Sequence, residues 1–136
     1  MGNKRLSIIS KYITLQVPLE IIYHALKDTR LEKLFPEFFI GVTRRSIDDK
    51  ANRELTFLTS TQNGQIQIVE RFKLKISGSN NTSIEYITET NVIENDVVIQ
   101  SILQTHIVNI LYSLLMLETG YINGSMKKRE KNHNYR

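Results

Sequence analysis

Residues 65–76 alternate between apolar and polar side chains more strictly than any other stretch of the sequence. One set is apolar (Ile66, Ile68, Phe72, Leu74 and Ile76), and the other is polar or basic (Gln65, Gln67, Arg71, Lys73 and Lys75). Because side chains of a strand point alternately to the two faces of a sheet, this pattern predicts a strand with one buried face and one face in water. Such strands are typical of an antiparallel sheet.

The remainder of the chain divides into further predicted strands and helices. Runs rich in β-branched and aromatic residues predict strands at residues 6–17, 39–48, 53–61, 82–90 and 97–104. Asn63-Gly64 separates two of these runs and tolerates the positive φ of a tight hairpin turn. Apolar spacings of three and four residues predict short helices at residues 19–26 and 30–34 and a long helix at about residues 106–128.

The lengths of these elements indicate how they pack. The long helix would span about 35 Å at 1.5 Å per residue, and strands of nine to twelve residues would span roughly 30–40 Å. The helix can therefore lie along the whole sheet. A twisted sheet of six long strands curls, and a curled sheet closed by one helix need not fill its interior with side chains.

Composition is that of one folded domain, with 40% hydrophobic and 24% charged residues in a chain of 136. We expect a single domain at residues 1–130 and a basic tail at residues 131–136. The N-terminus has no apolar segment typical of a signal peptide. The apolar run at residues 107–117 is about half the length that spans a bilayer. There is no cysteine, which suits a reducing compartment, so a cytoplasmic protein without a transmembrane segment is expected.

The net charge of +4 comes from a terminal cluster of Lys127, Lys128, Arg129, Lys131 and Arg136. A nucleic-acid-binding domain would carry its basic residues across a folded surface with aromatic residues among them. We therefore expect no nucleic-acid partner and interpret the cluster as positive charge that offsets a helix dipole.

The order of elements resembles the START and birch-pollen-allergen-like superfamily, whose members have the helix-grip fold. The run VPLEIIYHAL at residues 17–26 is similar to that family's passage from the first strand through a proline into a helix, and Leu34-Phe35-Pro36 is similar to its passage into the second strand. The chain looks closest to small uncharacterised archaeal members. The resemblance implies an α+β fold: a curved antiparallel sheet of six to seven strands around a long C-terminal helix, with two short helices after strand one. Relatives bind sterols, lipids, plant hormones or polyketides, and some are cyclases or dehydratases.

The resemblance also implies an apolar cavity between sheet and helix. The residues expected to line it are Phe57, Ile68, Phe72, Leu74, Ile84, Tyr86, Ile99, Leu103, Ile107, Leu111, Leu114 and Tyr121. An ordinary packed core would use the same residues, so the sequence favours a cavity through the fold alone.

Glu70 is a carboxylate on the apolar face of residues 65–76. A carboxylate buried there either is paired or holds its proton with a raised pKa. It could anchor a ligand hydroxyl or act as a general acid/base. Alternatively it lies near the rim and pairs with Arg44 or Arg71. His106, at the expected start of the long helix, either faces the cavity or is exposed to water.

Three functions stay open. The first is a carrier or sensor of a hydrophobic, lipid-like or polycyclic molecule, which we favour. The second is a cyclase, dehydratase or hydrolase that uses Glu70, and the third is an interaction module that binds through the basic tail. No metal ligands or nucleophile motif are recognisable and no cofactor is expected. Apolar residues on the outer sheet face, such as Val69, could support a homodimer.

Overall fold

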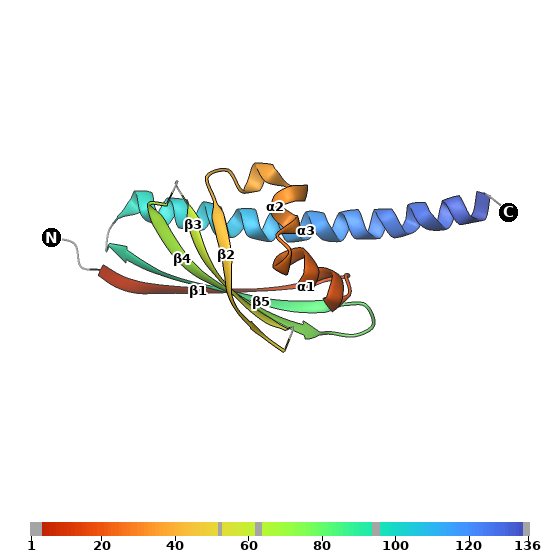
Figure 1. The fold of residues 1–136 in the computed structure, drawn as a ribbon, viewed down its shortest axis with the longest axis horizontal. Coiled ribbons are helices and arrows are strands. Elements are labelled where there is room, and N and C mark those ends of the chain that lie inside the picture. Colours follow the sequence, from red (N-terminus) through yellow and green to blue (C-terminus); the bar gives the residue numbers. More distant parts are fainter. Residues whose placement is uncertain (1–3, 52, 62–63, 94–95, 135–136) are drawn as a thin grey trace.

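The computed structural model describes residues 4–51, 53–61, 64–93 and 96–134 (Figure 1). The chain begins with strand β1 (Lys4–Leu15), followed by helices α1 (Leu19–Lys27) and α2 (Arg30–Leu34) and a turn of 3-10 helix, η1 (Pro36–Phe38). Four strands follow, β2 (Thr43–Lys50), β3 (Glu54–Thr61), β4 (Ile66–Ile76) and β5 (Thr82–Ile93). Helix α3 (Val97–Asn134) ends the described chain.

The strands form one antiparallel sheet in the order β1-β5-β4-β3-β2. Strands β2 to β5 pair in chain order, and β1 pairs with β5, so β1 and β2 are the two edges. The predicted hairpin lies between β3 and β4, where Thr61 pairs with Ile66 and Gly64 has a φ of 94°. Asn63 of that hairpin lies outside the described residues. The sheet crosses the N-terminal half of α3, and the helix extends past it (Figure 1).

The prediction of six to seven strands is wrong, because the sheet has five. Residues 97–104, expected to be a strand, are the first turns of α3. Oδ1 of Asp96 accepts a hydrogen bond of 3.0 Å from the backbone N–H of Ile99, as the N-cap residue of a helix does. From this cap onward the buried or half-buried apolar residues recur at helical spacing (Ile99, Ile102, Leu103, Ile107 and Ile110).

The early start of α3 also changes the expected match of lengths. With 38 residues the helix is about 57 Å long, whereas the 12-residue strands β1 and β5 span about 40 Å. The helix backbone continues to Asn134, through most of the expected tail at residues 131–136. Residues 135–136 lie outside the described chain.

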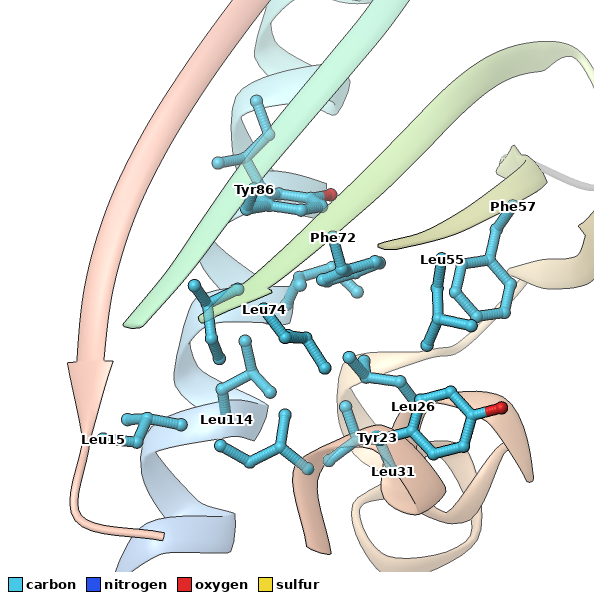
Figure 2. Packing of buried hydrophobic residues seen from close by; sticks show 14 of the residues in the cluster. Leu15, Tyr23, Leu26, Leu31, Leu55, Phe57, Phe72, Leu74, Tyr86 and Leu114 are labelled. Carbon is cyan, nitrogen blue, oxygen red and sulfur yellow. The ribbon is translucent and has the colours of Figure 1, made fainter. Parts of the chain in front are cut away.

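The core lies between the inner face of the sheet, α1, α2 and the buried stripe of α3. Figure 2 shows Leu74 and Tyr86 from the sheet, Leu26 from α1 and Leu114 from α3 turned into this common interior. The alternation predicted for residues 65–76 holds in β4 as far as Lys75, and Ile76 at its end is exposed.

Helix α3 is apolar and long enough over Val97–Gly124 to cross a membrane by length and composition. In this structure the same segment is the core helix of the fold. Its buried stripe, formed by Leu103, His106, Ile107, Ile110, Ser113 and Leu114, packs against the sheet and the short helices. Val108, Tyr112, Leu115 and Met116 lie on its exposed face.

Candidate functional site

Glu70 is fully buried in the middle of β4, between Ile68 and Phe72 on the inner face of the sheet. Its carboxylate meets four side chains from four different elements. Oε1 accepts hydrogen bonds from Nε of Arg44 at 3.2 Å and from the hydroxyl of Thr59. Oε2 is bonded to the hydroxyl of Tyr86 and lies 2.9 Å from Nε2 of His106. Glu70 is therefore paired in the interior and does not lie at the rim.

Arg44 of β2 is the cation of this cluster, and its side chain is only 1% exposed. Its Nη1 donates to Oε1 of Glu32 on α2 at 3.0 Å, so the guanidinium joins two carboxylates. Its centre lies 4.4 Å from the ring centroid of Phe57, within the range of a cation–π contact. Of the two partners weighed for Glu70, the structure places Arg44 at the carboxylate. Arg71 instead pairs with Glu89.

The charges of the cluster follow from opposing effects on each pKa. Burial raises the pKa of Glu70, but the Arg44 guanidinium and the hydrogen bond from His106 outweigh burial and lower it to about 2. Burial and the negative charge of Glu70 raise the pKa of Tyr86, so its hydroxyl keeps the proton and donates a hydrogen bond to the carboxylate. Glu70 is therefore an ionised acceptor at neutral pH rather than a proton-holding acid.

Two buried polar atoms next to Glu70 have no hydrogen-bond partner in the part of the chain that the structure describes. They are Nη2 of Arg44 and Oγ1 of Thr88, the residue that pairs with Glu70 on β5. A ligand that reached the cluster could therefore accept a hydrogen bond from Nη2 of Arg44 and form one with the hydroxyl of Thr88. Among the same described residues, no group of three or more His, Cys, Asp or Glu could hold a metal ion.

A cleft of about 260 Å³ reaches this cluster from the surface. It lies where the segment from η1 to β2 and the end of β3 meet the first turns of α3. Its lining residues are Glu37, Phe38, Ile40, Val42, Thr61, Ser101, Ile102, Thr105, His106 and Asn109. His106 belongs to both the cleft and the buried cluster, because it lines the cleft while its Nε2 contacts Glu70. Depressions of about 450 and 570 Å³ near α1 and near β1 include no residue that contacts Glu70.

None of the residues predicted to line a cavity lines this cleft. Except for Glu70, they belong to one hydrophobic cluster, in which the structure buries Phe57, Ile68, Phe72, Leu74, Ile84, Tyr86, Leu103, Ile107 and Leu114 and half-buries Ile99, Leu111 and Tyr121. Phe72 packs between Phe57 and Tyr86, with ring centroids 5.7 and 4.8 Å away.

The sequence left alternatives open for two members of the cluster: His106 could face the cavity or be exposed to water, and Arg44 was one of two possible partners of Glu70. His106 follows Leu103 by three residues and precedes Ile110 by four, so extending the helical pattern toward the N-terminus would have placed it on the buried face. Arg44 lies in a strand whose side chains are otherwise mostly exposed, and no pattern in that strand indicates that one arginine is buried.

The fold has counterparts among solved structures, although no family model and no curated protein matches the sequence. A START superfamily protein from Mycobacterium smegmatis aligns with 84% of this chain and 98% of its own, at a TM-score of 0.63 and 10% identity. The Zhui aromatase/cyclase from Streptomyces aligns with 87% of this chain and 96% of its own, at a TM-score of 0.62 and 9% identity. Norcoclaurine synthase from Thalictrum aligns with 89% of this chain and 99% of its own, at a TM-score of 0.59 and 11% identity.

These alignments cover 84–89% of this chain and 96–99% of the other chains, at TM-scores of 0.59–0.63. The chain therefore has a helix-grip fold, and its structural neighbours are START and birch-pollen-allergen-like proteins.

Proposed function

We propose that this protein binds a hydrophobic small molecule between the sheet and α3, as a carrier or sensor, and that the molecule enters through the cleft at His106. The observation that carries the proposal is the connection between a cleft of mixed character and a buried polar cluster with unused hydrogen-bonding groups; the apolar part of the cleft wall is Phe38, Ile40, Val42 and Ile102. Ligand sites of proteins combine apolar contacts with a few convergent polar groups.

The size of the cleft limits what fits without rearrangement. Its volume of about 260 Å³ is just below the range of roughly 300–1,000 Å³ for small-molecule pockets. One or two rings would fill it. A longer lipid-like molecule would have to separate α3 from η1, where Phe38 stacks on Tyr112 with ring centroids 6.4 Å apart. Displacing the apolar residues predicted to line a cavity would then create that cavity.

An enzyme of the cyclase, dehydratase or hydrolase type is the second candidate. Glu70 itself is poorly suited to general acid/base catalysis at neutral pH, because its pKa of about 2 keeps it ionised and makes it a weak base. The geometry favours His106 as the base that meets a substrate, with Glu70 as the residue that positions its ring. A neighbouring fold with cyclase activity supports this candidate only by analogy.

Two further expectations belong to the same proposal. A cytoplasmic location fits the cysteine-free composition. A homodimer could use the outer sheet face, where Val69 is half-buried and Leu6, Ile8 and Tyr12 of the edge strand β1 are exposed. The side chains of the basic cluster from Lys127 onward lie outside those that the structure describes, so binding through them stays a prediction.

Native mass spectrometry of freshly purified protein tests the main proposal. We expect a non-covalent adduct of small-molecule mass on the wild type. Ile102→Trp should fill the cleft and lower the adduct fraction at least several-fold. Val108→Trp, on the exposed face of the same helix, should leave it unchanged. A bare protein mass, together with no binding of an added neutral aromatic probe such as naphthalene, would refute the proposal.

A further inference from the structure

We propose that the ligand of the cleft carries a neutral hydrogen-bond donor, a hydroxyl or an N–H, and that Nδ1 of His106 accepts this hydrogen bond. This inference rests on the proposed function, because it names the chemical class that the same cleft selects. It follows from the position of one proton and from the charges around the cleft.

The proton on His106 is placed by Glu70. The Glu70 carboxylate is ionised beside Arg44 and already accepts from the hydroxyls of Thr59 and Tyr86. An ionised carboxylate can only accept, so the Nε2 atom of His106, 2.9 Å from it, must carry the hydrogen of that bond. We infer that His106 is the neutral imidazole, in which a proton on Nε2 leaves a lone pair on Nδ1.

Nδ1 of His106 has no hydrogen-bond partner among the residues that the structure describes. Nε2 is turned inward to Glu70. Because the His106 ring also lines the cleft, we infer that Nδ1 presents an acceptor to whatever fills it. An acceptor at the wall of a binding site favours a partner that can donate a hydrogen bond.

The rest of the wall argues against an anionic ligand. Glu37 adds a carboxylate to the cleft, and no lysine or arginine occurs among its ten lining residues. Behind the wall, both formal charges of Arg44 and Glu70 are already matched. A fatty-acid or other carboxylate head would therefore enter without a cation to pair with, whereas a phenol or alcohol would find the Nδ1 lone pair.

Three naphthalene derivatives of nearly equal size test the inference by titration calorimetry on the full-length protein. They are 2-naphthol, which donates a hydrogen bond, naphthalene, which cannot, and 2-naphthoate, which is an anion. We expect 2-naphthol to bind roughly three- to tenfold more tightly than naphthalene, the value of one net hydrogen bond. We expect 2-naphthoate to bind most weakly.

The readout that assigns the acceptor uses the wild type and so does not depend on a variant that folds. In ¹⁵N-labelled protein, 2-naphthol should shift the Nδ1 resonance of His106, and naphthalene should leave it near its free value. His106→Leu should reduce the 2-naphthol affinity to that of naphthalene. Gln104→Leu, a change of an exposed residue of α3 that does not line the cleft, should keep the preference.

The outcomes separate this inference from the proposed function. If naphthalene and 2-naphthol both fail to bind, the cleft is not a hydrophobic site and both proposals fall. If they bind equally and Nδ1 does not respond, the cleft binds apolar molecules but the donor requirement is wrong. Tightest binding by 2-naphthoate, or loss of the preference in Gln104→Leu but not in His106→Leu, would also overturn the inference.

Discussion

Nε of Arg44 lies 3.2 Å from Oε1 of Glu70, although the two residues belong to β2 and β4, which are not neighbours in the sheet. The strand between them, β3, contributes the hydroxyl of Thr59 to the same carboxylate oxygen. Four elements, β2, β3, β4 and β5, are thus joined to one ionised group, and His106 adds α3. The cluster therefore ties the sheet to the core helix as well as to the cleft.

Removing the charge of Glu70 should destabilise the fold. In Glu70→Gln, Arg44 stays buried with only the carboxylate of Glu32 beside it. Breaking a buried ion pair by changing one partner costs about 3–5 kcal/mol, and urea unfolding monitored by circular dichroism measures that loss. Glu89→Gln is the matched control, since Glu89 pairs with Arg71 in a partly exposed site. The control should lose less than about 1 kcal/mol. Equal losses in the two variants would mean that the buried ion pair of Glu70 contributes no more to the free energy of unfolding than the partly exposed pair of Glu89.

The same carboxylate predicts the direction of acid denaturation. The folded pKa of Glu70, about 2, is lower than the value of about 4.3 for an unfolded glutamate. The unfolded state therefore binds the proton first as pH falls. The contribution, about 3 kcal/mol, is complete above pH 4.3 or so and is lost between there and about pH 2. Urea midpoints measured from pH 6 to pH 2 should show this fall, and Glu70→Gln should remove most of it. If Glu70→Gln kept the full pH dependence of stability, other carboxylates would be responsible for the loss of stability at acid pH.

Strands β4 and β5 could be predicted from the sequence, because the side chains of their inner face are buried and those of their outer face are partly or fully exposed. The start of α3 could not be predicted from propensity, since Val97, Val98 and Ile99 are β-branched and favour strands. The capping residue Asp96 and the helical spacing of the buried residues Leu103, His106 and Ile107 favour a helix instead, and the structure has a helix here.

The hydrogen-bond partners of Glu70 could not all be predicted from the sequence. The position of Glu70 on an apolar face was enough to single it out. Its partners are 26 and 36 residues away in Arg44 and His106. That pairing depends on the order of strands in the sheet and on the rotation of α3, which no local pattern encodes. Glu70 and Tyr86 could therefore be predicted as site residues, and Arg44 as one of two possible partners, but the network could not.

The capping hydrogen bond of Asp96 tests where α3 begins. Asp96→Ala removes the acceptor for the Ile99 N–H, and the loss of an N-cap costs about 1 kcal/mol. Thermal unfolding should therefore show a lower midpoint. Asp96→Ser, which keeps a capping oxygen, should recover most of the difference. If alanine and serine behave alike and hydrogen exchange finds residues 97–104 unprotected, the helix does not start at this cap.

Alanine variants of two adjacent leucines of α3 distinguish the effect of burial on stability from that of helix propensity. Leu114 is fully buried, and Leu115 is 40% exposed on the other side of the helix. Leu114→Ala should cost about 2–5 kcal/mol because it leaves a cavity between sheet and helix. Leu115→Ala should change stability by about 0.5 kcal/mol or less. Urea unfolding of both variants makes the comparison. A large loss in Leu115→Ala would show that the exposed face of α3 is covered in solution, for example by a second copy of the chain.

Gly120 and Gly124 of α3 should tolerate alanine. In the structure the helix continues past both, and a Cβ at either position would meet nothing within 4 Å. Each Gly→Ala change should therefore stabilise the fold by about 0.4–1 kcal/mol, since alanine loses less backbone entropy in a helix.

Gly64→Ala is the contrasting variant. It should destabilise the fold, because a φ of 94° strains any L side chain. Thermal unfolding at several protein concentrations would measure all three. A concentration-dependent loss of stability in Gly120→Ala or Gly124→Ala would mean that another chain packs against these glycines in solution.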